Sequence, residues 1–136
     1  MLEAMNELLD GFNLNPGVNP SEISAFRTAT GLELPGDYAD LLEAGNGGEG
    51  FIGSISYAIL WKLQELQEFN AEYEVSEYAP GLFLFGSDGG GEAFAFDTRT
   101  SPWAVVQVPF VGMDAELAEP MGDSFLAFLQ RLHERE

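Results

Sequence analysis

The chain has 136 residues and an apolar fraction of 46%, which suffices for one globular domain, expected over residues 1–136. It has no cysteine and one histidine, which excludes disulfides, thiolate metal sites and a cysteine nucleophile and disfavours two-histidine metal sites. With 5 Lys and Arg against 23 Asp and Glu, its formal charge is −18, so it lacks the basic clusters that nucleic acids require and we expect no nucleic-acid partner.

The sequence contains no apolar run long enough to span a bilayer. Its N-terminal stretch is acidic and lacks the basic region that begins a secretory signal. The negative charge also disfavours anionic membrane surfaces. We therefore expect a cytoplasmic protein without a membrane partner.

Three helices are expected in the first third of the chain. Apolar residues recur at helical spacing from Leu2 to Leu9 and stop at Gly11. The stretch 19–22 (Asn-Pro-Ser-Glu) is typical of a helix entry with an asparagine cap, and this helix should end near Gly31. A third helix should lie between Pro35 and Gly45.

The rest of the chain is expected to be rich in strands. Residues 45–50 are rich in glycine and predict a loop, and residues 112–121 are acidic and predict an irregular segment. The ordered elements expected are a strand over 55–61, a helix over 63–69, a hairpin of 82–85 with 93–96, a strand over 103–108 and a helix from Asp123 or Ser124. This order predicts an α+β fold with a largely antiparallel sheet of about four to six strands, packed with N-terminal helices, one crossing helix and a C-terminal helix.

The hairpin carries apolar residues at every position of both runs. With an even number of turn residues, Phe83 would lie opposite Phe94 and all four phenylalanines would share one face. Leucines and alanines would then form the other face, so the sheet would be covered twice or would leave one face for a partner. With an odd number, the two faces would be mixed.

Residues 86–91 form a glycine-rich turn that does not resemble a phosphate loop. A strand follows the turn where a phosphate loop requires a helix, and Asp88 and Glu92 would repel an anion. The spacing of these two carboxylates does not match that of a calcium loop either. We expect no cofactor and no functional metal site.

No catalytic residues stand out. With 23 acidic residues a carboxylate pair is available, as in a hydrolase, but the sequence singles out no two of them. His133 lies in the last turn of a helix, and no serine sits in a nucleophile elbow. A carboxylate-based or metal-assisted hydrolase is therefore the least favoured function, and we expect no enzyme.

The acidic residues form a block without bases. Between Leu63 and Thr98 there are eight carboxylates and no lysine or arginine. Such a block is either a solvated surface that keeps the protein soluble or a docking face for a basic protein. Trp61 and Tyr73 flank its most acidic helix and have the area and polar atoms favoured at interfaces. The candidate partner-binding residues are Trp61, Glu65, Glu68, Glu72, Tyr73, Glu74, Glu77, Asp88 and Glu92.

The chain resembles the SUKH superfamily (Smi/Knr-like domains), which includes relatives of fungal cell-wall assembly regulators and many bacterial immunity proteins. The resemblance extends from about Ser21 to Leu132, and the order and spacing of its landmarks carry it. These landmarks are residues 34–42 (LPGDYADLL), 46–50 (NGGEG), 60–66 (LWKLQEL), Asn70, Tyr73, 87–91 (SDGGG) and 123–129 (DSFLAFL).

The resemblance implies an α+β domain that binds a protein and has no catalytic residues of its own. For a bacterial member it implies an immunity-type protein that neutralises a toxin, often a nuclease, by docking to it. A nuclease must be basic to hold its substrate, so a basic toxin would suit the acidic block. The alternative is a regulatory or scaffold protein, whose partner need not be basic.

Overall fold

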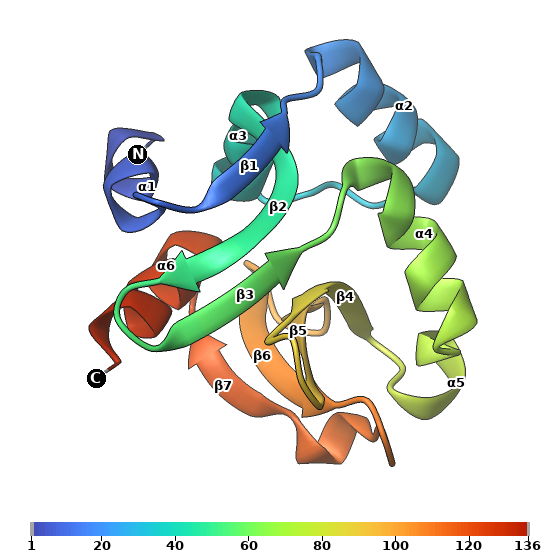
Figure 1. Cartoon of the computed structure of the whole chain (residues 1–136). Helices are drawn as coiled ribbons and strands as arrows, with labels where there is room; N and C mark the ends of the chain where they lie inside the picture. The colour runs from blue at the N-terminus through green and yellow to red at the C-terminus, as the bar shows by residue number, and fades with distance from the viewer. Residues whose placement is uncertain (1, 136) are drawn as a thin grey trace.

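Every strand of the central sheet pairs with its neighbours in the sequence, so seven strands form an antiparallel meander from β1 to β7 (Figure 1). The computed structural model describes residues 2–135. The strands are β1 (Asn13–Pro16), β2 (Gly45–Ile52), β3 (Ser56–Leu60), β4 (Leu82–Ser87), β5 (Glu92–Asp97), β6 (Ala104–Pro109) and β7 (Glu119–Gly122). The helices are α1 (Leu2–Leu8), α2 (Pro20–Thr30), α3 (Gly36–Ala44), α4 (Leu63–Glu72), α5 (Val75–Tyr78) and α6 (Phe125–Glu134), with a 3-10 turn η1 (Ala115–Leu117). The predicted α+β class is confirmed, with more strands than expected.

The predicted helix boundaries follow from local capping. The Oδ1 atom of Asn19 accepts a hydrogen bond from the Glu22 N–H, and the Glu22 carboxylate accepts one from the Asn19 N–H, each at 3.0 Å. Gly31 ends α2 in a left-handed conformation, with φ of 73°. At α6, the Ser124 hydroxyl accepts from the Ala127 N–H at 3.1 Å. None of the helices within residues 2–135 is long and apolar enough to cross a membrane.

Two predicted irregular segments contain strands. Residues 45–50, predicted as a loop, begin β2, and residues 112–121, predicted as irregular, contain η1 and most of β7. Two glycines of β2 are required by close backbone approach: a Cβ on Gly47 would lie 2.5 Å from the Leu60 carbonyl oxygen, and one on Gly48, where φ is 151°, would lie 2.0 Å from the Asn13 carbonyl oxygen. Glycine content was therefore a sign of tight strand packing and not of a loop.

The aromatic face of the β4–β5 hairpin packs on α3 and α6. Phe83 pairs with Phe96 and not with Phe94. Next to the turn Ser87 pairs with Ala93 and Gly86 with Phe94, a register that would place Asp97 opposite Phe83, and a bulge between Leu84 and Gly86 shifts it by one residue to Phe96. The four hairpin phenylalanines nevertheless share one face. The ring of Phe85 lies 5.5 Å from that of Phe128 in α6 and 5.6 Å from that of Tyr38 in α3, centroid to centroid.

The opposite face of the sheet is only half covered. Helices α4 and α5 pack against β4, over the face to which Leu84 and Ala95 point. On β2 and β3 the same face remains open, so that Phe51 is 54% exposed and Tyr57 is partly exposed. Figure 1 shows this open face toward the viewer, with α3 and α6 behind it and α4 to its right. An antiparallel sheet tolerates such one-sided solvation.

The sheet splits between β3 and β4, and a side chain closes the split. The two strands share only two residue pairs, Ile59 with Ser87 and Leu60 with Gly86. Further along β4, Asn70 of α4 takes the place of a strand. Its Nδ2 donates to the Leu84 carbonyl oxygen and its Oδ1 accepts from the Leu84 N–H, each at 2.9 Å.

Both edge strands are short and contain proline. β1 and β7 have four residues each, with Pro16 in the first and Pro120 in the second. Proline removes a donor from the ladder, and short edges offer little to an incoming strand. Neither edge is therefore suited to pair with another chain.

We expect Asn70→Ala to lower the free energy of unfolding by about 2 kcal/mol, because the N–H and carbonyl oxygen of Leu84 would both lose their partner. Urea denaturation checks this value. Gln67→Ala is the matched control, because Gln67 lies exposed on the same helix, and its effect should stay within about 0.5 kcal/mol. Equal effects of the two substitutions would contradict the bridging role of Asn70.

Candidate partner-binding face

A groove of about 570 Å³ lies where the open face of the sheet meets the start of α4. We call it the β3–α4 groove. Its size falls within the range of pockets that hold ligands in proteins. It is lined by Asn13, Asn15, Gly48, Glu49, Tyr57, Ile59, Leu60, Trp61, Lys62, Glu65 and Phe69.

The strand side of the groove combines aromatic and acidic groups. The Tyr57 hydroxyl donates a hydrogen bond to the Glu49 carboxylate, which raises the pKa of Tyr57. The Tyr57 ring packs edge to face with Phe51, with 5.2 Å between ring centroids. This contact extends the aromatic surface beyond the groove.

The helix side is fixed by the start of α4. One oxygen of Glu65, Oε1, accepts from the Lys62 N–H at 2.9 Å, and Asn46 Oδ1 accepts from the Leu63 N–H at 2.7 Å. Two of the free N–H groups at the helix start are thereby satisfied. Glu65 therefore has a structural role in addition to lining the groove.

Trp61 is a core residue at the groove margin, only 7% exposed. It begins an aromatic row that runs outward along α4. Its ring lies 4.8 Å from that of Phe69 and is stacked on that of Tyr73 at 6.3 Å. The Tyr73 ring in turn lies 4.8 Å from that of Phe110, and Tyr73 is 43% exposed. Of the two flanking aromatic residues in the prediction, only Tyr73 thus offers substantial surface.

Three of the predicted acidic residues form one stripe along α4. Glu65, Glu68 and Glu72 are three and four positions apart, so they follow one side of the helix, and we call them the acidic stripe. Glu74 and Glu77 continue the exposed acidic surface at the junction with α5. Glu74 adopts a φ of 52°, an uncommon value for a residue with a side chain, at the turn between the two helices.

Asp88 and Glu92 are placed differently. Asp88 Oδ1 accepts from the Gly90 N–H at 2.8 Å and the Glu92 N–H at 3.2 Å, so it holds the β4–β5 turn. The Glu92 carboxylate accepts from Gln107 Nε2 at 3.2 Å. Because Glu92 is two residues before Phe94 in β5, its side chain points to the α6 side of the sheet. Glu92 is thus not continuous with the acidic stripe.

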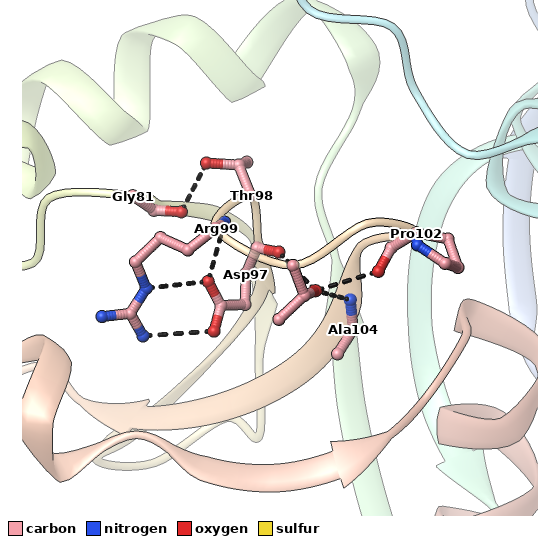
Figure 2. A network of polar contacts seen from close by, with 7 residues as sticks. Gly81, Asp97, Thr98, Arg99, Pro102 and Ala104 are labelled. Carbon is pink, nitrogen blue, oxygen red and sulfur yellow. Dashed lines mark hydrogen bonds and ion pairs between the residues drawn. The ribbon is translucent and has the colours of Figure 1, made fainter.

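The last carboxylate of the acidic block, Asp97, is neutralised. Arg99 Nε donates to Asp97 Oδ1 at 2.9 Å and Arg99 Nη2 donates to Oδ2 at 3.1 Å, a two-bond ion pair in the β5–β6 turn (Figure 2). The side-chain hydrogen bonds from Arg99 hold the pKa of Asp97 below its usual range. The free acidic surface therefore does not extend to Asp97.

Sequence reasoning missed the strand side of the groove. Glu49 lies in the segment predicted as a loop, and Phe51 follows that segment directly. Tyr57 lies in a predicted strand, but the sequence did not show which face of the sheet its side chain would occupy. The strand register would have placed Glu49 opposite Ile59 and Phe51 opposite Tyr57 on one face. In residues 2–135, no group of three or more His, Cys, Asp or Glu side chains is arranged to hold a metal ion.

The fold and the open face define an α+β domain built on one antiparallel meander, with a groove between sheet and helix. The model of the SMI1 / KNR4 family (SUKH-1) matches residues 17–131, and the chain belongs to this family. The predicted SUKH resemblance is thereby confirmed. No curated protein matches the chain.

We expect Asp97→Asn to destabilise the protein at neutral pH and to have less effect in acid. The pKa of Asp97 is lower in the folded than in the unfolded chain, so its stabilising effect is present above the unfolded value of about 3.9. It is lost as the pH falls through the folded pKa. Urea denaturation between about pH 7 and pH 2.5 checks this expectation.

Asp40→Asn is the control for this substitution, because Asp40 is exposed on α3 and carries no side-chain hydrogen bond among the described residues. A difference between Asp97→Asn and the unmodified protein that stayed constant down to the lowest pH would contradict the role of the ion pair.

Proposed function

We propose that this protein is a bacterial, cytoplasmic immunity-type protein that neutralises a basic, nuclease-like toxin by docking to it. The contact surface would be the acidic stripe, the adjoining Glu74 and Glu77, and the half-exposed Tyr73. Family membership supports a protein-binding role, and the observation that carries the proposal is the unneutralised acidic surface beside an exposed aromatic residue.

The charge of this surface is not compensated locally. Two ion pairs join side chains among residues 2–135, Arg27 with Glu33 and Arg99 with Asp97, and neither involves α4 or α5. Lys62, just before α4, is the nearest base in the sequence. An anionic surface of this kind steers a cationic partner and accelerates association, and it can occupy the groove in which a nuclease holds its anionic substrate.

The two groove carboxylates are oriented by the fold. Glu49 accepts the hydrogen bond of Tyr57, and Glu65 caps the first turn of α4. Each of these bonds uses one carboxylate oxygen, so both groups can still accept a hydrogen bond from a partner.

We expect the double reversal Glu68→Lys with Glu72→Lys to slow association with the basic partner on the order of ten-fold at about 50 mM salt, and less as salt rises. Glu65 is left unchanged because its reversal would remove the helix cap. The measurement is surface plasmon resonance with the partner captured from the source cells, together with the partner's nuclease activity with and without this protein.

Glu3→Lys with Glu7→Lys is the matched control. It changes the net charge equally at two exposed residues of α1, a helix that packs on α3 and α6. If both double reversals slow association equally, overall charge and not the α4 surface is responsible. A partner that binds without loss of its activity would refute neutralisation.

A second candidate function is a regulatory or scaffold protein with a partner that is not basic. The half-exposed Phe51 and Tyr73 favour this role, because aromatic residues contribute much of the energy at protein interfaces. For such a partner, we expect Tyr73→Ala to weaken binding about ten-fold, with little dependence on salt. Strong salt dependence of the same complex would contradict this alternative.

A further inference from the structure

We propose that the β3–α4 groove is a binding site for an arginine-bearing segment of the partner. This inference rests on the proposed function, since it names the chemistry by which a basic partner is anchored. The groove is distinct from the acidic stripe, because only Glu65 belongs to both. Its volume of about 570 Å³ accommodates a short stretch of chain.

The aromatic and acidic groups of the groove together match a guanidinium group. Tyr57 and Phe69 line it, and Trp61 forms its margin. A guanidinium group stacks on aromatic rings and also donates in a planar fork to carboxylates, whereas a lysine ammonium group lacks the planar fork. The groove therefore favours arginine over lysine at equal charge.

Each of the two groove carboxylates still has an oxygen that can accept hydrogen bonds from a guanidinium group. Glu49 uses Oε2 for the Tyr57 hydroxyl, and Glu65 uses Oε1 for the Lys62 N–H. Among residues 2–135, the second oxygen of each carboxylate has no hydrogen-bond donor within the protein. These bonds fix the orientation of both carboxylates before a ligand arrives, which lowers the entropic cost of binding.

Lys62 is the one base that lines the groove, and it opposes the binding of a cation. It is exposed and forms no ion pair within the described part of the chain. Replacing it with alanine should therefore strengthen the binding of arginine. Asn13 and Asn15 contribute no charge to the groove.

The test is calorimetric titration of the full chain with the peptide acetyl-Gly-Arg-Gly-Arg-Gly-amide and its lysine and citrulline counterparts, at about 50 mM salt. We expect the arginine peptide to bind about five-fold more tightly than the lysine peptide, and the neutral citrulline peptide to bind least. Equal affinities for arginine and lysine would overturn the proposal.

Glutamine variants locate the site. Glu49→Gln and Glu65→Gln each keep an acceptor for the existing hydrogen bond, so the fold is preserved, and each should weaken arginine binding about three-fold. Glu68→Gln removes the same charge from α4 outside the groove and should have a smaller effect. Equal losses of affinity for the arginine peptide in all three variants would assign the binding to general surface charge and overturn the proposal that the groove is the binding site.

This experiment separates the groove from the proposed function, because it uses peptides and no partner. Selective arginine binding, together with a basic partner that binds this protein and keeps its nuclease activity, would support the groove as a binding site and refute neutralisation. Conversely, we expect the Glu49→Gln variant to lose affinity for the toxin. If it binds and neutralises a basic toxin with unchanged affinity, the proposed function is supported and the role of the groove in binding is refuted.

Discussion

The structure depends on how the separation of β3 from β4 is closed. After two residue pairs the ladder between these strands stops, and the N–H and carbonyl oxygen of Leu84 in β4 would be left without partners on the β3 side. The amide of Asn70 supplies both missing hydrogen bonds and thereby fixes α4 to the sheet. Asn46, in β2, fixes the other end of this helix by capping its first turn. The position of the groove and of the acidic stripe follows from these two asparagines.

The same separation explains why one face of the sheet is open. Because α4 is held at the split, it covers the strands that follow it and leaves β1, β2 and β3 solvated on that side. The groove is thus the boundary between a covered and an uncovered half of one face. Its aromatic groups on the strand side are kept apart from the fully buried phenylalanines on the other face by the alternation of side chains along each strand.

Much of the fold could be predicted because its signals are local. The cap at Asn19, the proline before α3 and the apolar runs of β4 and β5 act within a few residues, and each marks its element correctly. β2 could not be predicted, because its glycines are needed where a strand distant in the sequence packs closely against its backbone. For the same reason, the helix side of the site could be proposed from the acidic block, whereas Glu49 and Tyr57 are brought to it by strand register alone. Asp97 was counted with the free acids because its partner Arg99 lies just beyond the block.

The sequential order of the strands has a consequence for how the chain folds as it is synthesised. The hairpins β2–β3, β4–β5 and β5–β6 can form soon after their residues emerge, whereas β1 and β3 each wait for a partner strand that follows two helices. The aromatic face of β4 and β5, however, is covered only in part, by α3, until α6 has been translated. During that interval the nascent sheet exposes a phenylalanine surface of the kind that promotes aggregation. The net charge of −18 opposes association between copies of the chain and so acts against this hazard.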